Sequence, residues 1–337
     1  MNGNLVRTVT RDPALSARVI DRAPLYFSGG ADALTDRPAH VRAGSGLARV
    51  LGALALVQDD SNFIALVDPT APQAARAVIL PPGPDGRRQF GDAIGNKHLK
   101  LDLEACFATE TTEPLFVALG SGATPARETV VLISGWATGA LDTRVIPAPD
   151  LYGQLRAATG FAGSELNIEG ALLLGPTLRL FSRGNGAARG ALQPLNATCD
   201  LPWPDVLAHL EHPAVRPAPE PTRFTKYFLG ALAGVPLGFT DATAWGDRVL
   251  FTASAENSPD TVRDGHVSGS VIGFIDPTGT PRWAPITDAA GVHVPEKAEG
   301  LLMADADAAE LWVVADVDDE TRPSELWRVR LRGPWRD

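Results

Sequence analysis

Residues 166–185 read LNIEGALLLGPTLRLFSRGN, and this stretch contains the pattern that decides the fold. A polar opening, Asn167 and Glu169, leads into an apolar run. A Gly-Pro pair then precedes a second apolar run, which closes on a polar cluster around Arg183. Short apolar runs separated by glycine and proline predict two antiparallel β-strands joined by a tight turn. The opening and the closing cluster should lie at the same end of this hairpin, because the chain has reversed direction.

The same order of opening, strand, turn, strand and closing cluster recurs along the chain. Successive openings lie roughly 60 to 70 residues apart, which is longer than the ~40–50 of a compact propeller blade but is consistent with blades that carry loop insertions. The five openings are Ser45, Asp102 with Glu104, Asn167 with Glu169, Thr240 with Asp241, and Lys297 with Glu299. The repeats predict an all-β protein that is a single β-propeller. Five blades are preferred and six are the alternative.

The rest of the sequence fits one propeller domain spanning residues 1–337. Strand patterns continue on both sides of the proline-rich stretch 212–224, which we interpret as an extended connector between blades. The strand-forming runs within residues 1–40 are expected to complete or close a blade. Helical patterns occur at Pro149–Ala158 and at Trp203–Glu211, where proline and aspartate offer helix starts, and we interpret both as loop insertions.

Composition narrows the functional classes. The 337 residues carry a net charge of -10, which argues against a general nucleic-acid or anionic-membrane binder. No apolar run approaches the ~20 residues of a membrane span, and the N-terminal residues lack the apolar core of a secretory signal. We therefore expect a cytoplasmic protein. Cys106 and Cys199 are the only cysteines, too few for a disulfide framework, and neither has a zinc or redox motif around it.

The openings also predict a cation site on the propeller axis. Three of them contain polar residues two positions apart, which share one face of a strand: Asp102 and Glu104, Asn167 and Glu169, Lys297 and Glu299. Carboxylates that converge on one axis repel one another unless a proton or a cation compensates them. Because the openings contain oxygen ligands and no His or Cys, a hard cation is expected. Calcium is favoured and magnesium is the alternative.

The ordered series of openings, with the Asp59-Asp60 turn in the first unit and KAEG in the last, resembles the calcium-activated nucleotidase (apyrase) family. The resemblance extends from about Ser45 to about Gly300. It implies a five-bladed propeller that holds calcium in its central channel and hydrolyses nucleoside di- and triphosphates. It also implies a metal-ligand set: Ser45, Glu104, Glu169, Thr240 and Glu299. Asp102, Asn167 and the lack of a basic residue after Asp60 depart from the family pattern. The chain also resembles the six-bladed phytase-like propellers.

Three functional hypotheses follow from these patterns. The first is a metal-dependent hydrolase that acts on a phosphate ester, an anhydride or a related ester of a small anionic molecule. The second is a non-catalytic propeller that binds a ligand or a protein and holds a structural calcium. The third is a scaffold with a water-filled channel. The sequence contains no phosphate-binding loop, nucleophile elbow or zinc-protease motif that would favour another enzyme class.

The first hypothesis assigns roles to the closing clusters and to nearby basic residues. Candidate catalytic residues are Asp59, Asp60 and Asp316 as general bases and Arg183 as an anion-stabilising group. Candidate contacts to the substrate phosphate are Lys97, Lys100, His266 and Lys297.

Overall fold

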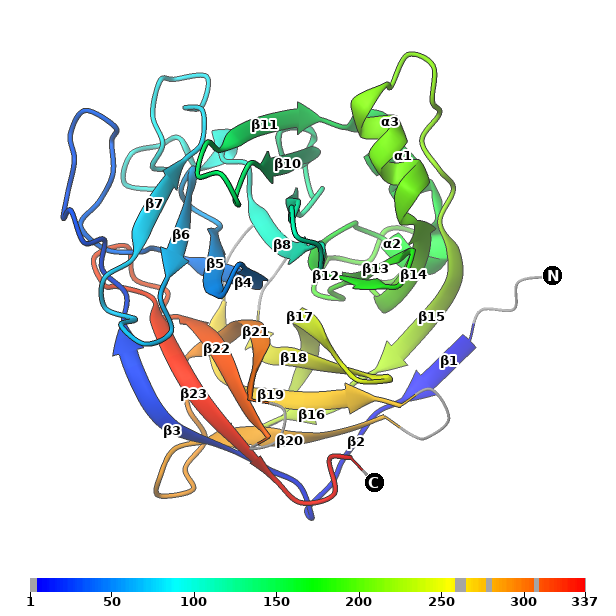
Figure 1. The fold of residues 1–337 in the computed structure, drawn as a ribbon. Coiled ribbons are helices and arrows are strands. Elements are labelled where there is room, and N and C mark those ends of the chain that lie inside the picture. Colours follow the sequence, from blue (N-terminus) through cyan, green and yellow to red (C-terminus); the bar gives the residue numbers. More distant parts are fainter. Residues whose placement is uncertain (1–4, 258–264, 277–280, 306–308, 337) are drawn as a thin grey trace.

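The computed structural model describes residues 5–257, 265–276, 281–305 and 309–336, and it consists mainly of antiparallel sheets (Figure 1). The first two groups of four strands follow the chain in order. The first group contains β4 (Gly44–Val50), β5 (Ala53–Gln58), β6 (Phe63–Val67) and β7 (Arg76–Ile79). The second contains β8 (Leu103–Ala108), β9 (Phe116–Gly120), β10 (Thr129–Ser134) and β11 (Asp142–Pro147).

Three further groups of strands complete the structure. The third contains β12 (Ile168–Leu174), β13 (Thr177–Ser182), β14 (Asn196–Pro202) and β15 (Thr222–Phe228). The fourth contains β17 (Val235–Trp245), β18 (Arg248–Asn257), β19 (His266–Ile275) and β20 (Arg282–Thr287), with the short β16 (Ala231–Leu232) beside β17. The fifth contains β21 (Lys297–Asp305), β22 (Glu310–Asp316), β23 (Glu325–Arg332) and β3 (Ser16–Pro24).

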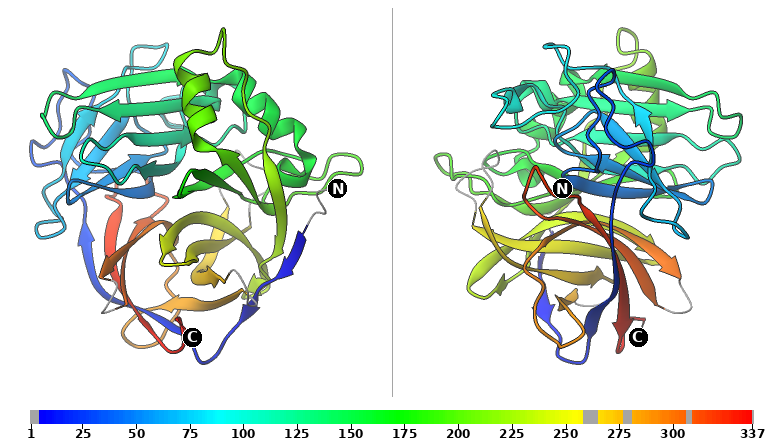
Figure 2. Two further views of the ribbon diagram at one scale, coloured as in Figure 1. Left: turned by 45° about the vertical axis from the view of Figure 1, so that its right-hand side comes forward. Right: turned by 90° about the vertical axis from the view of Figure 1, so that its left-hand side faces the viewer.

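The first strand of each group is the innermost one. These strands contact one another in the cyclic order β4, β8, β12, β17, β21 and back to β4. The groups therefore surround a common axis, which is the architecture of a β-propeller (Figures 1 and 2). The prediction of an all-β propeller is confirmed at this level.

The N-terminal residues tie several groups together. β1 (Leu5–Thr8) pairs in parallel with β15, and β2 (Thr10–Arg11) pairs in parallel with β20. β3 pairs antiparallel with β23 and in parallel with β20, so it joins the fourth and fifth groups into one sheet. In Figure 1, β3 in blue lies along β23 in red. The chain start thus supplies the outer strand of the last group.

The connection between β14 and β15 corrects one interpretation. Residues 212–224 run from the end of α3 (Trp203–Glu211) to β15, and β15 lies beside β14 in the same sheet. The interpretation of this stretch as a connector between blades is therefore wrong, because α3 is inserted within a group. The helices predicted at both insertions are confirmed as α1 (Pro149–Ala157) and α3, and α1 is followed by the one-turn α2 (Thr159–Ala162). Among the described residues, no helix has the length and apolar character needed to cross a membrane.

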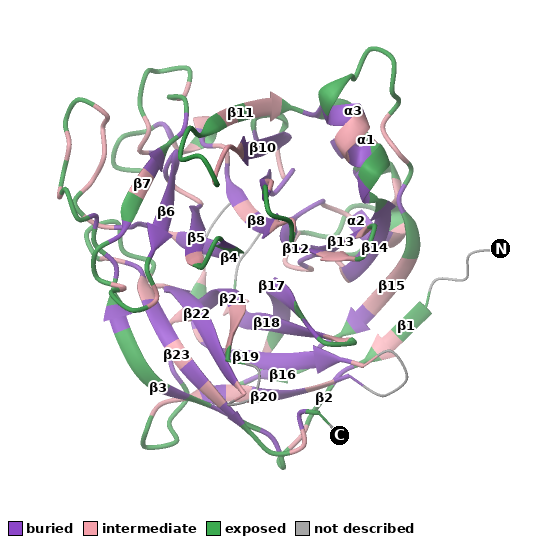
Figure 3. Ribbon diagram, in the orientation of Figure 1, coloured by how far each residue is buried: buried purple, intermediate pink, exposed green. Residues whose placement is uncertain are grey.

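The apolar core lies between the groups rather than on one face of each. Among the described residues, five apolar clusters each combine side chains from two neighbouring groups. Inner and middle strands are consequently buried on both faces, as their colouring in Figure 3 shows. This explains why their sequences are nearly continuous apolar runs instead of alternating ones.

Each inner strand contains a β-bulge at its opening. The pairing of the inner strand with the second strand shifts register between Gly44 and Leu47 in β4, Leu103 and Ala105 in β8, Ile168 and Gly170 in β12, Phe239 and Asp241 in β17, and Ala298 and Leu301 in β21. A bulge leaves a residue outside the ladder and re-aims its side chain. The residues inside these bulges include Ser45, Glu104, Glu169, Thr240 and Glu299, so the five openings occupy equivalent places.

Gly300 allows the bulge of β21 to approach β4 closely. A Cβ atom at this position would lie 2.7 Å from the carbonyl oxygen of Ser45 and 2.8 Å from the amide nitrogen of Leu47. Gly300→Ala is expected to lower the free energy of unfolding by about 1–3 kcal/mol, because backbone atoms would have to move. Denaturant unfolding measures the change. Gly153→Ala in α1 is the control, since its Cβ meets nothing within 4 Å, and it should stabilise the protein slightly.

Candidate functional site

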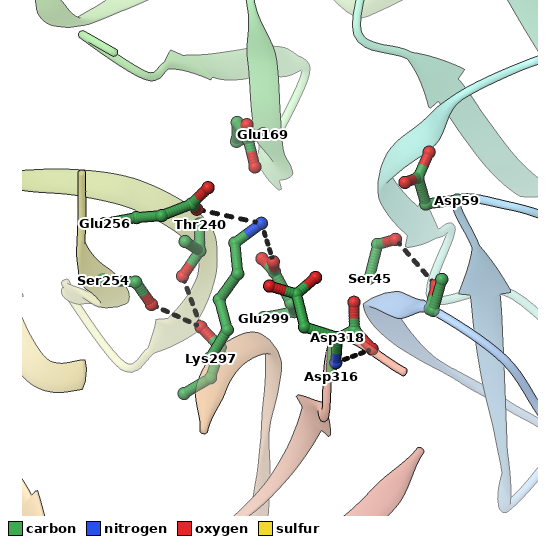
Figure 4. Close-up of polar contacts among 12 residues, drawn as sticks. Ser45, Asp59, Glu169, Thr240, Ser254, Glu256, Lys297, Glu299, Asp316 and Asp318 are labelled. Atoms are coloured by element: carbon green, nitrogen blue, oxygen red, sulfur yellow. Dashed lines mark hydrogen bonds and ion pairs between the residues drawn. The ribbon is translucent and has the colours of Figure 1, made fainter. Parts of the chain in front are cut away.

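A small pocket of about 30 Å³ lies at one mouth of the propeller axis, and we call it the axial pocket. Its size suits a water molecule or an ion. The charged residues that line it are six acids and one lysine: Asp59, Asp60, Glu104, Glu299, Asp316, Asp318 and Lys297. Ser45 and Gly44 complete the lining. The first, second and fifth openings therefore meet the closing clusters of the first and fifth units at this pocket (Figure 4).

Glu299 has one oxygen that nothing in the described structure binds. The Lys297 Nζ atom lies 2.6 Å from Glu299 Oε1, because residues two apart on β21 share a face. Glu299 Oε2 is buried and has no hydrogen-bond partner among the described residues, although the residue is only 4% exposed. A buried carboxylate oxygen without a partner is costly, and such an atom suggests a missing ligand.

Glu104 is in a similar position on β8. Among the described residues, its carboxylate makes no hydrogen bond or ion pair. Burial, together with the charges of Asp59, Glu169, Asp102 and Glu299, raises the pKa of Glu104 well above its ordinary value. One carboxylate oxygen from each of Asp59, Asp102 and Glu104 lies within 4.8 Å of the others, a separation that allows one metal ion to bind all three. The protein therefore contains an acidic triad that could hold a metal ion.

Two members of this triad already have a cationic partner. Lys100 Nζ lies 2.5 Å from Asp59 Oδ1, 3.1 Å from Asp60 Oδ1 and 2.8 Å from Asp102 Oδ1. Asp102 also pairs with Arg127 at 2.9 Å. Burial acts to raise the pKa of Asp102, but Lys100 and Arg127 outweigh it and hold that pKa below its ordinary value. Of the triad, Asp59 and Glu104 line the axial pocket. Asp102 does not line it and forms ion pairs with Lys100 and Arg127 instead.

Lys100 occupies a different place from the one predicted for it. Its side chain is only 4% exposed and its ammonium is enclosed by three carboxylates. The residue does not line the axial pocket or either of the two pockets beside it. Lys100 therefore holds Asp59 and Asp60 in place, and the structure does not place it where a substrate phosphate could reach it.

Glu169 is held by protein groups on the other side of the axis. It accepts a hydrogen bond of 2.6 Å from Asn167 Nδ2 and forms an ion pair of 3.4 Å with Arg183. Arg183 also pairs with Glu256 at 2.6 Å, and its side chain is 3% exposed. Burial raises the pKa of Glu169 to about 7, although the charge of Arg183 opposes this shift. Neither Glu169 nor Arg183 lines the axial pocket, so Arg183 compensates buried carboxylates rather than facing an incoming anion.

The two polar residues at the fourth opening connect β17 to β21. The Thr240 hydroxyl donates a hydrogen bond of 2.6 Å to the Ala298 carbonyl. The Asp241 carboxylate accepts one of 2.9 Å from the Leu301 amide. The metal set implied by the family resemblance is thus divided by the structure. Ser45, Glu104 and Glu299 line the axial pocket, whereas Glu169 and Thr240 do not.

Two larger pockets flank the axial pocket, and both are lined by Asp316 and Asp318. One has a volume of about 150 Å³ and contains Arg42 and Lys97; we call it the Lys97 pocket. The other has a volume of about 280 Å³ and is lined by ten residues: Gly265, His266, Val267, Pro295, Glu296, Lys297, Asp316, Val317, Asp318 and Arg322. We call it the His266 pocket.

The segment containing Asp316 and Asp318 lines both of these pockets. The structure places the predicted residues Lys97 and His266 in different pockets. Sequence patterns missed Arg42, which lies 3.8 Å from both Asp60 and Glu320, because a single arginine in a loop carries no signal. Asp318 stands two positions after the predicted base Asp316, and this spacing could have marked it.

The pH dependence of stability should report on Asp316. Burial, with the nearby charge of Asp318, raises the pKa of Asp316 from 3.8 to about 7. Between about pH 4 and pH 7, the folded protein keeps a proton on Asp316 that the unfolded chain releases. The contribution of this group to the free energy of unfolding is therefore complete below about pH 4 and is lost as the pH rises through about 7. Without divalent cations, we expect the melting temperature to fall from pH 5 to pH 8 more in the wild type than in Asp316→Asn. Equal slopes would contradict this assignment.

A protein-family model covers residues 40–331 of this chain. The chain belongs to DUF6929, a family of unknown function. Its members are therefore defined by sequence and not by a known reaction. The sequence matches no curated protein.

Several solved structures resemble the chain over nearly its whole length. Glutaminyl cyclase from Myxococcus xanthus is 12% identical, with 98% of this chain and 99% of that chain covered and a TM-score of 0.45. A putative exo-beta-1,3-galactanase from Bifidobacterium bifidum s17 is 9% identical, with 91% and 92% covered and a TM-score of 0.44. Virginiamycin B lyase from Staphylococcus aureus is 9% identical, with 94% and 99% covered and a TM-score of 0.40. Similarities this low transfer no reaction or substrate to this chain.

Proposed function

We propose that this protein is a five-bladed propeller that binds a divalent cation in the axial pocket and hydrolyses a phosphate ester or a related ester at that mouth. Calcium is the favoured cation and magnesium is the alternative. The observation that carries the proposal is Glu299 Oε2, a buried oxygen without a partner in a pocket that is lined by six acids and one lysine. Each of the five strand groups around the axis counts as one blade.

The donor set of the axial pocket fits a hard cation. Glu104, Glu299 and Asp59 offer carboxylate oxygens and Ser45 offers a hydroxyl, while no His or Cys lines the pocket among the described residues. Burial raises the pKa of Glu104 well above its ordinary value, and no described cation pairs with it, so a charged carboxylate at this position lacks compensation. Burial also raises the pKa of Asp59, although the charge of Lys100 opposes that shift. A bound divalent cation would supply that compensation in place of protons.

The residues around the pocket can divide the work of hydrolysis. A bound cation would polarise the scissile group and lower the pKa of a water molecule. Asp316 is the best candidate for the general base, because its pKa of about 7 lets it accept a proton at neutral pH and it lines all three pockets at the mouth. Asp59 and Asp60 are held by Lys100, so Asp59 serves as a cation ligand and Asp60 shapes the pocket, and neither is the favoured base. Lys297 is the cationic side chain in the axial pocket and can stabilise a developing anion.

Calorimetric titration of metal-free protein with calcium and with magnesium tests the cation site. We expect one cation to bind per chain and to raise the melting temperature, because a ligand that binds only the folded state stabilises it. Chelator should reverse the shift. Titrations that detect neither calcium nor magnesium would contradict the cation site and, with it, the proposed function.

A screen of phosphate monoesters, nucleotides and carboxylic esters tests the reaction. Turnover should require the bound cation and should fall by about 100-fold or more in Asp316→Asn, since loss of a general base typically costs this much. If the cation binds but no ester is turned over, the second candidate function holds. The cation would then have a structural role. The ion pairs that hold Asp59, Asp60 and Glu169 favour this role, because they fix these acids within the fold.

A further inference from the structure

The Lys297 side chain lies between the axial pocket and the His266 pocket, and it lines both. Its Nζ atom is 2.6 Å from Glu299 Oε1 and 3.4 Å from Glu256 Oε2. Figure 4 shows the ammonium between these two carboxylates. Lys297 therefore has two partners, of which one is a candidate cation ligand and the other is not.

We propose that Lys297 is a tethered counter-ion that a divalent cation replaces at Glu299, and that its ammonium then turns toward Glu256 and the His266 pocket. This inference rests on the proposed cation site. It makes Lys297 a residue that sets the affinity of that site and links it to the neighbouring pocket.

Electrostatics gives the reason for the exchange. Glu299 offers one oxygen to Lys297 and leaves the other without a partner, so a cation bound at Glu299 would lie a few ångströms from the ammonium. Like charges at such a distance in a buried site repel strongly. Glu256 is already within ion-pair distance of Lys297, so the ammonium keeps a carboxylate partner when it leaves Glu299.

The exchange also has a consequence for the substrate. The His266 pocket contains Lys297 with the exposed residues His266 and Arg322, and its walls include Val267, Pro295 and Val317. An ammonium released from Glu299 would add a positive charge to this pocket. Cation binding and the binding of an anionic group in this pocket should then strengthen each other, since such coupling is reciprocal. The substrate class that fits is a small ester that carries one anionic group beside an apolar part.

Calcium affinity of a lysine variant tests the proposal. Lys297→Met should bind calcium about tenfold or more tightly than the wild type, because a positive charge near the site is removed. Lys226→Met in β15 is the matched control and should bind as the wild type does, since it lines none of these pockets. Unchanged or weaker binding by folded Lys297→Met would overturn the inference.

A second measurement uses the wild-type protein and does not depend on how the variant folds. The chain has four lysines, Lys97, Lys100, Lys226 and Lys297, so NMR signals of ¹⁵N-labelled side-chain ammonium groups can be assigned. Calcium should shift the Lys297 signal strongly and leave that of Lys226 unchanged. If calcium binds and the Lys297 signal stays in place, the exchange does not occur although the proposed function survives. If neither calcium nor magnesium binds, the proposed function itself fails.

Discussion

Glu299→Gln is expected to weaken calcium binding by on the order of 100-fold, because calcium affinity depends on the number of charged ligands. The substitution keeps the shape of the side chain but removes the negative charge of the carboxylate. The Oε2 atom of this carboxylate has no partner among the described residues. Lys297 retains Glu256 as a partner, so the fold should persist. Calorimetric titration measures the affinity, and thermal unfolding in chelator shows whether the variant is folded.

The control for this experiment is an acid of the same kind away from the axis. Glu113 lies exposed in the loop between β8 and β9, and Glu113→Gln should bind calcium as the wild type does. Glu104→Gln is expected to resemble Glu299→Gln, since both residues line the axial pocket. Glu169→Gln should have a smaller effect, because Asn167 and Arg183 already bind Glu169. Equal losses for Glu169→Gln and Glu299→Gln would show that the site is centred elsewhere on the axis.

Deleting residues 1–24 is expected to prevent the protein from folding into a stable monomer. This deletion removes β3, whose Ala17, Val19 and Ala23 are buried and whose two edges pair with β20 and β23. Without it, both of those strands expose an unpaired edge, and the ring of groups loses the pairing between its fourth and fifth members. Circular dichroism and denaturant unfolding should show loss of the cooperative transition.

A shorter deletion separates this effect from loss of the chain start in general. Deleting residues 1–8 removes β1, whose side chains are mostly exposed and which only adds an edge to β15. This variant should unfold cooperatively with nearly wild-type stability. A synthetic peptide of residues 1–24 added to the longer deletion should restore folding, because β3 is held by non-covalent pairing. A cooperative, fully stable protein after removal of residues 1–24 would contradict the role assigned to β3.

Local sequence patterns predict some features of the candidate site and not others. The alternation of side chains correctly places Asn167 beside Glu169 and Lys297 beside Glu299, because strand geometry acts within a few residues. Hairpin reversal correctly brings Asp59 and Asp316 to the same mouth as the openings. Local patterns could not predict the bulges that aim the openings at the axis, since a bulge depends on how the neighbouring strand pairs.

The partners of each carboxylate depend on contacts between distant residues. Lys100 binds Asp59, which is 41 positions away in the sequence, and Arg183 binds Glu256, which is 73 positions away. These two cations decide that Asp102, Glu169 and Asp59 have protein partners while Glu299 keeps a free oxygen. The family resemblance treats the five openings alike and therefore could not distinguish Glu169 and Thr240 from Ser45, Glu104 and Glu299.

The amino-acid sequence by itself determined the strands, the hairpins and the repeated polar openings, because these follow from apolar spacing and turn residues within each unit. It also determined that acids would gather at one mouth. Only the tertiary structure decided which acids line the axial pocket, that β3 completes the last group, and that residues 212–224 lead to a strand of the same sheet as β14. The physical reason is that ring closure and ion pairing join residues far apart in the chain, whose meeting no local pattern encodes.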